Sequence, residues 1–173
     1  MLPAGPLMAE HRLIERMVRL MKAEASRERR IDLPFIDAVV DFLRTYADKT
    51  HHGKEEDILF RELGRKPLSS EHRRIMDELV NEHAIARKSV SELKACRERY
   101  AKGDPGALEG IISALHALAE LYPKHIETED KRFFLPVMAY FSEEEQQAML
   151  ERFWEFDRRM IHSKYKDIVG KLF

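Results

Sequence analysis

Two segments of the chain repeat the same spacing of a histidine and a glutamate. His51 precedes Glu55 by four residues, and His125 precedes Glu129 by the same interval. Each glutamate is followed by another acidic residue and, a few positions later, by an apolar pair that contains phenylalanine. On an α-helix, residues four apart lie on one face, one turn above each other. Each segment can therefore present an imidazole and a carboxylate to the same metal ion.

Two further histidines extend this repeat to both halves of the chain. His11 and His83 each follow a glutamate directly and lie 72 residues apart, while His51 and His125 lie 74 apart. The near-equal offsets predict a duplicated helical hairpin whose four histidines and two glutamates meet in the interior. Imidazole nitrogens and carboxylate oxygens in this number suit a pair of first-row metal ions, iron above all.

The elements that position these residues are helices. Apolar periodicity and end signals predict helices over about residues 7–29, 34–63, 69–100, 107–132 and 142–169. The chain has only seven glycines and seven prolines, which argues against an all-β fold. We expect an all-α, antiparallel up-down four-helix bundle with an additional C-terminal helix. The whole chain, 1–173, is expected to form a single domain, with the metal-binding bundle at about 7–139 and the extra helix at about 142–170.

Composition limits the classes of partner. Thirty basic side chains against 31 acidic ones give a net charge of -1, which offers no basic surface for nucleic acid or an anionic membrane. No apolar stretch approaches the roughly 20 residues of a membrane span, and the first residues lack the pattern of an export signal. The single cysteine, Cys96, excludes an internal disulfide and suits a reducing compartment. We expect a cytoplasmic monomer or homodimer.

Taken together, the motifs resemble the hemerythrin-like (HHE cation-binding) domain family. The resemblance covers about residues 8–134 and rests on an early Glu-His, a mid-chain Glu-His and the two His-x-x-x-Glu segments. It implies a four-helix bundle that holds an oxo- or hydroxo-bridged, non-haem di-iron centre, in which zinc or manganese can replace iron in a purified sample. The implied metal ligands, with both glutamates bridging, are His11, His51, Glu55, His83, His125 and Glu129.

Neighbouring residues offer alternative ligands. His52 and Glu56 keep the same spacing one residue later, because a rotation of about 100° exchanges the two pairs. His52 can also lie just outside the ligand set. Asp130 is an alternative to Glu129, since the last carboxylate of the oxygen-carrying relatives follows its histidine by five residues. The internal repeat selects Glu129, which we prefer.

Other polar residues are expected to have no role at the metal. Glu10 and Glu82 adjoin predicted ligands, and each carboxylate could accept a hydrogen bond from the other ring N–H of a ligand imidazole. Because neighbouring helical residues point about 100° apart, we prefer the solvated surface for both. The remaining histidines fall outside the repeat and are expected to be structural: His72, His116 and His162.

The oxygen carriers of the family have a fifth histidine that this chain lacks. It stands four residues before the third-helix histidine, and Leu79 occupies that position here, before His83. Two octahedral ions need roughly twelve coordination positions, so two bridging carboxylates, four imidazoles and a bridging oxide leave about one open on each ion. Water or a tyrosine such as Tyr46 or Tyr122 can fill them. Otherwise, open positions on both ions argue against a dedicated O2 carrier and favour reaction with, or sensing of, small ligands.

The sequence thus predicts a non-haem di-iron protein that binds or senses O2, peroxide or nitric oxide, and a binding protein rather than a classical enzyme. By resemblance, the alternatives are peroxide reduction and donation of iron for repair of iron–sulfur clusters. The repair proteins usually carry an N-terminal segment with cysteines, which this sequence does not show. A third alternative is a helical interaction module that holds zinc or no metal.

Overall fold

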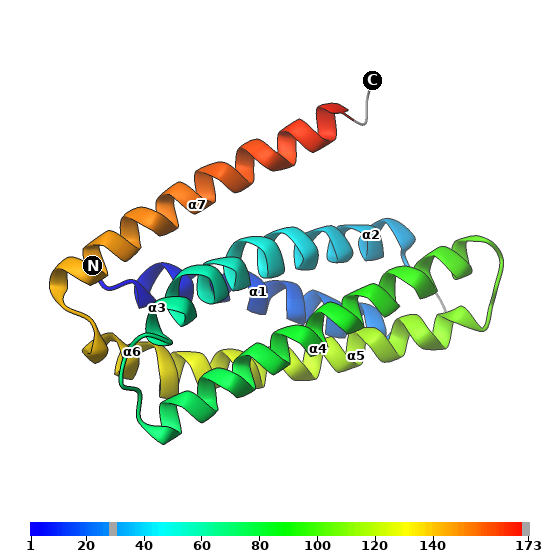
Figure 1. Ribbon diagram of the computed structural model, residues 1–173. Helices are drawn as coiled ribbons and strands as arrows, with labels where there is room; N and C mark the ends of the chain where they lie inside the picture. Colours follow the sequence, from blue (N-terminus) through cyan, green and yellow to red (C-terminus); the bar gives the residue numbers. More distant parts are fainter. Residues whose placement is uncertain (28–30, 171–173) are drawn as a thin grey trace.

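The computed structural model describes residues 1–27 and 31–170, with the side chains of 1–27, 31–161 and 164. All regular elements in these ranges are helices, and the expected all-α bundle is confirmed (Figure 1). The side chain of His162, which the sequence suggested to be structural, lies outside the described residues. None of the described helices combines the length and apolarity needed to cross a membrane.

Four helical columns form the bundle, and a fifth helix follows them (Figure 1). The first column is α1 (Ala4–Ala25), and the third is α4 (Ser70–Ala101). The second column consists of α2 (Leu33–Phe42), η1 (Leu43–His52), η2 (Glu55–Phe60) and α3 (Arg61–Leu63). The fourth consists of α5 (Ala107–Thr128), η3 (Glu129–Phe133), α6 (Phe134–Val137) and η4 (Met138–Tyr140). The fifth helix is α7 (Glu143–Gly170).

Local sequence signals set several helix ends. The Ser69 hydroxyl accepts a hydrogen bond from the backbone N–H of His72 and so caps α4. Ser142 and Glu145 exchange hydrogen bonds at the start of α7, where each side chain accepts from the other's backbone N–H. Gly103 lies in the turn between α4 and α5 with φ of +92°, a conformation that favours glycine.

The apolar core is divided into two clusters by one polar layer. One cluster contains Ile14 of α1 and Tyr122 of α5, and the other contains Leu7 of α1 and Phe133 of η3. Along α1, His11 falls between the two apolar positions, and each of the other columns is interrupted by polar residues at the corresponding place. The layer therefore lies inside the bundle, with apolar packing on both sides.

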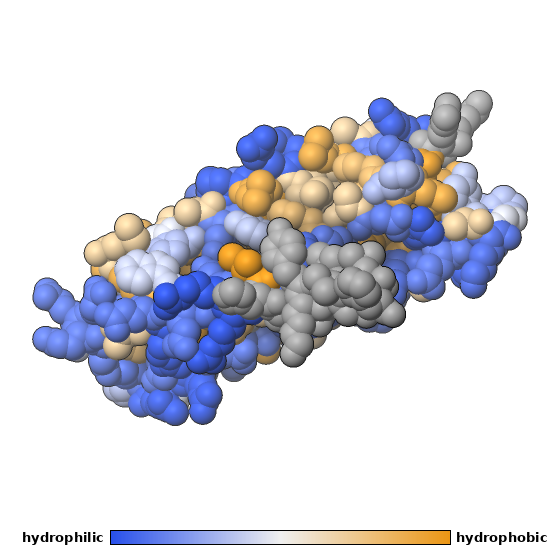
Figure 2. Space-filling view, turned by 90° about the horizontal axis from the view of Figure 1, so that it is seen from above, coloured by the Kyte–Doolittle hydropathy of each residue, from blue (hydrophilic) through white to orange (hydrophobic). Residues whose placement is uncertain are grey.

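Helix α7 packs against η1 and η2 of the second column. Its Phe153 is fully buried, and the Phe156 ring lies over Gly53, where an added Cβ would come within 2.7 Å of the ring. The predicted C-terminal helix is thus part of the folded structure. From the side that carries α7, the surface is mostly hydrophilic with scattered apolar patches (Figure 2).

Candidate metal centre

Six buried side chains from all four columns meet in the polar layer. Each is at most 3% exposed, so none of them is hydrated as it would be at the surface. They are the six residues that the sequence predicts: His11, His51, Glu55, His83, His125 and Glu129.

Glu55 joins the second column to the third. Its Oε1 lies 3.1 Å from Nε2 of His51, one helical turn earlier in the same column. Its Oε2 lies 3.3 Å from Nε2 of His83 on α4. The two oxygens of one carboxylate therefore face histidines from different halves of the chain.

Glu129 makes the equivalent connection between the fourth column and the first. Its Oε2 lies 3.1 Å from Nε2 of His11 and 3.3 Å from Nε2 of His125. The histidines themselves form two close pairs, with Nε2 atoms 2.9 Å apart for His11 and His51 and 3.2 Å apart for His83 and His125. Two carboxylates thus link two histidine pairs.

The other ring nitrogen of each of these histidines faces a carboxylate from a neighbouring column. Because an ionised carboxylate can only accept, each Nδ1 carries the hydrogen, which leaves the lone pair of neutral imidazole on Nε2. The four Nδ1–carboxylate pairs are His11–Asp130 at 2.7 Å, His51–Glu10 at 2.8 Å, His83–Glu56 at 2.6 Å and His125–Glu82 at 2.7 Å.

These contacts correct one expectation and narrow two alternatives. Glu10 and Glu82 do not belong to the solvated surface: the rotation of about 100° from the adjacent histidine turns each toward the next column, where it holds that column's histidine. Asp130 holds His11 and Glu56 holds His83 in the same way, so each histidine of the two pairs has its own carboxylate. Glu56 is therefore directed at His83 and not paired with His52.

The two central carboxylates are the test of whether a cation fits. Among the described residues, no hydrogen-bond donor satisfies either oxygen of Glu55 or of Glu129, although all four atoms are buried. Buried carboxylates without donors are costly, because they lose water and gain nothing in return. Cations placed between the carboxylates and the Nε2 lone pairs compensate for both, so the donor set fits bound metal.

In the metal-free protein, protons on the histidines supply the positive charge that metal ions would otherwise provide. Burial alone lowers the pKa of His51, but the charge of Glu55 and the hydrogen bond with Glu10 raise it to about 10. The pKa of His125 is likewise lowered by burial and raised by Glu129 to a net value of about 10. Burial and Glu55 raise the pKa of Glu129, yet His125 and His11 bring it down to about 2. The layer thus attracts positive charge strongly.

A family model described as the hemerythrin HHE cation binding domain matches residues 3–137. This match includes every residue of the polar layer and the four columns as far as Val137. The chain belongs to the hemerythrin family. The predicted resemblance is therefore confirmed, and α7 lies outside the matched residues. Neither the curated proteins nor the solved structures contain a match to this chain.

In this hemerythrin-family bundle, the stretches that carry His51, Glu55 and Glu129 are wound more widely than an α-helix. The N–H of Gly53 donates to the carbonyl of Asp48, and the N–H of Phe134 donates to the carbonyl of Glu129, each across five residues. Such π turns often occur at functional sites. Successive residues are rotated by less than the roughly 100° of an α-helix, which helps His51 and its neighbour His52 to be buried together.

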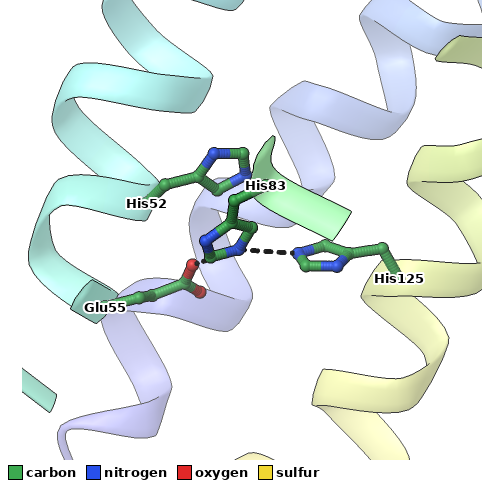
Figure 3. A group of neighbouring side chains, drawn as sticks. All are labelled: His52, Glu55, His83 and His125. Carbon is green, nitrogen blue, oxygen red and sulfur yellow. Dashed lines mark hydrogen bonds and ion pairs between the residues drawn. The ribbon is translucent and has the colours of Figure 1, made fainter. Parts of the chain in front are cut away.

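His52 is a fifth histidine in the polar layer. Its side chain is 1% exposed, and its ring stacks on that of His83, with centroids 3.8 Å apart and planes 13° apart. Burial lowers the pKa of His52 to about 4, so the ring is neutral near pH 7. One ligand atom of His52 lies within 4.8 Å of ligand atoms on Glu55, His83 and His125 (Figure 3). The second group of this kind is His11, His51, Glu55 and Glu129.

Lys54 is a functional candidate that sequence reasoning missed. Its side chain is fully buried, and its ammonium donates to Glu10 and forms an ion pair with Asp157 of α7 at 2.8 Å. Since Glu10 holds His51, a chain of charged contacts links α7 to the polar layer. A lysine beside paired histidines gives no sequence signal of burial, which only the packing of α7 produces.

Proposed function

We propose that this hemerythrin-family chain holds two iron ions and uses them to bind or sense O2, peroxide or nitric oxide. The observation that carries the proposal is the position of Glu55 and Glu129, each buried between histidines from two different columns. A carboxylate shared in this way favours two adjacent ions over one. The ligand set would be His11, His51, Glu55, His83, His125 and Glu129.

The chemistry of the donors supports iron in particular. Imidazole and carboxylate together suit iron, whereas magnesium and calcium prefer oxygen alone, and no thiolate takes part. Bound iron supplies redox-active ions with coordination positions at which a small external ligand can bind. The protein orients the imidazoles through their Nδ1–H groups and keeps bulk water out with its two apolar clusters. The Phe134 ring, stacked on His11 with centroids 5.6 Å apart, belongs to that barrier.

A cavity beside the polar layer favours a ligand of a few atoms. It has a volume of about 240 Å³ and lies between the second column, α4 and α5. His52 and Tyr122 form its inner wall, and Asp48 and Arg87 form part of its rim. At about 30 Å³ for each water molecule, this space admits small molecules but not a large organic substrate.

Metal analysis of protein purified without a histidine tag tests the metal part of the proposal. We expect about two irons per chain and the absorption of an oxo- or hydroxo-bridged pair. One zinc, or no metal after growth with adequate iron, would contradict it. The ligand part is tested by titrating the reduced protein with nitric oxide under anaerobic conditions. An adduct visible by electron paramagnetic resonance or absorption is expected, and its absence would refute ligand binding.

A further inference from the structure

We infer that His52 supplies a fifth imidazole to the metal pair, on the side of His83 and His125. This inference rests on the proposed function and deepens it, since it identifies a ligand outside the six residues of the internal repeat. In the oxygen carriers, the fifth histidine comes from the third column, at the position that Leu79 occupies here. In this chain, His52 supplies the fifth imidazole from the second column instead. Leu79 itself is fully buried in an apolar cluster and leaves no polar donor there.

The first support is the convergence of four side chains on one side of the polar layer. His52 and Glu55 reach it from the second column, His83 from α4 and His125 from α5 (Figure 3). Ligand atoms of all four lie within 4.8 Å of one another. Three imidazoles and a carboxylate at this separation are a sufficient first set of donors for one octahedral ion.

The second support is a nitrogen with no other partner. Nε2 of His52 is buried, and no residue in the described part of the chain makes a hydrogen bond to it. A buried polar atom without a partner needs an explanation, and a metal ion beside it provides one. His72 gives a useful contrast, because this structural histidine uses Nδ1 to contact the Tyr140 hydroxyl and lies away from the group of ligands.

The third support is that His52 is oriented like the other four histidines of the layer. Its Nδ1 faces a carboxylate, Oδ1 of Asp48, at 3.4 Å, a longer contact than the other four make. The Asp48 oxygen is held in turn by Nε of Arg87 at 2.7 Å. A carboxylate on Nδ1 leaves the Nε2 lone pair for a metal, as in the other histidines.

A fifth imidazole makes the two metal positions unequal. The ion beside His83 and His125 gains His52 as a third nitrogen, while the ion beside His11 and His51 keeps two. By the same count of roughly twelve positions, only about one position stays open, and it lies on the His11 and His51 side. The cavity that His52 lines then gives small molecules access to the polar layer without facing that open position directly.

The variant His52→Phe separates ligation from packing. Phenylalanine keeps a flat ring that can stack on His83 but has no nitrogen. The control is His116→Phe, the same change at an exposed position of α5. Metal-free protein is titrated with Co²⁺ alone, and absorption gives the stoichiometry and affinity. We expect His52→Phe to lower the affinity for the second Co²⁺ by roughly 10–100-fold or more, because even the loss of a residue that only hydrogen-bonds to a ligand has an effect of this size. The control should bind two ions with the affinity of the wild-type protein.

A count of metal-bound histidines in the wild-type protein tests the inference without any variant. Protein labelled with ¹⁵N-histidine and loaded with Co²⁺ should give five paramagnetically shifted Nδ1–H signals. Four signals, with unchanged Co²⁺ affinity in His52→Phe, would overturn the role of His52 and leave the two-metal proposal intact. Wild-type protein that binds no pair of ions would overturn the proposed function itself, and the two failures are therefore distinguishable.

Discussion

Nδ1 of His51 lies 2.8 Å from Oε2 of Glu10, and the other oxygen of Glu10 accepts a hydrogen bond from the buried ammonium of Lys54. The second half of the molecule repeats only part of this arrangement. Glu82 holds His125 at 2.7 Å, but the position equivalent to Lys54 is Thr128. In both halves of the duplicated hairpin, a carboxylate therefore holds a histidine. Among the described residues, a buried lysine that pairs with α7 adds a further contact at Glu10 but not at Glu82.

The carboxylates that hold the histidines should matter for metal affinity. In Glu10→Gln and Glu82→Gln the side chain keeps its size but loses its charge, so the imidazole is less basic and less firmly oriented. We expect each change to weaken metal binding about 10–100-fold while the fold is retained. Glu127→Gln, which removes only a solvent-exposed ion pair with Lys131, is the matched control. Competition with a chelator of known affinity measures the effect, and unchanged affinity in both variants would rule out this role.

Removal of a central carboxylate should have a larger effect. We expect Glu55→Ala or Glu129→Ala to lose at least one of the two irons and to lower the melting temperature of the loaded protein, because metal-binding energy is also folding energy. His116→Ala, on the exposed face of α5, should keep both irons. Iron analysis and thermal unfolding are the measurements. Equal iron content in all three variants would refute the assignment of these glutamates.

The fold and the central residues can be predicted from local patterns in the sequence. Helix lengths follow from apolar periodicity, and the ends follow from residues such as Ser69 and the glycine-rich turn at 103–106. The repeat identifies His51 with Glu55, because the same spacing recurs at His125 and Glu129 and such a recurrence is improbable by chance. These features need no knowledge of how the columns contact one another.

What the sequence could not provide depends on contacts between columns and on backbone shape. The i+4 argument assumes an α-helix, so it separates His51 from His52, whereas the π turns bury both. The partner of Glu10 is on a different column, 41 residues away, and adjacency to His11 does not identify which histidine it holds. Lys54 lies buried between Glu10 of α1 and Asp157 of α7, two contacts that no local pattern indicates.

The metal-free protein should lose stability as the pH rises above neutrality. The pKa of His51 and that of His125 are raised from 6.5 to about 10, so their contribution is complete below pH 6.5 and is lost as the pH rises through 10. The pKa of Glu129 is lowered from 4.5 to about 2, so its contribution is lost only in acid. We expect the melting temperature of metal-free protein to be highest between pH 4.5 and 6.5 and to fall toward pH 10.

The same groups link metal binding to proton release. Near pH 7 an ion must displace the protons held by His51 and His125, so we expect about two or more protons to leave per pair of ions bound. Calorimetric titration in buffers of different ionisation enthalpy gives this number directly. Metal affinity should therefore increase from pH 6 to pH 9. Binding heats that do not depend on the buffer would contradict the proposed ligand set.

The buried ammonium of Lys54 connects Glu10 with Asp157 of α7. Lys54→Met removes the cation that Glu10 and Asp157 share and leaves the largely buried Glu10 carboxylate with His51 as its remaining partner. Loss of one member of a buried ion pair typically costs about 3–5 kcal/mol, so a drop of this order in the unfolding free energy is expected from urea titration of the metal-free protein. The more exposed Asp157→Asn should cost much less. The double variant Lys54→Met with Glu10→Gln should recover part of the loss, since the buried side chain that lost its cation is then neutral. If the double variant is less stable than Lys54→Met by the full cost of Glu10→Gln, the two residues are not coupled, and the charged link from α7 to His51 does not exist.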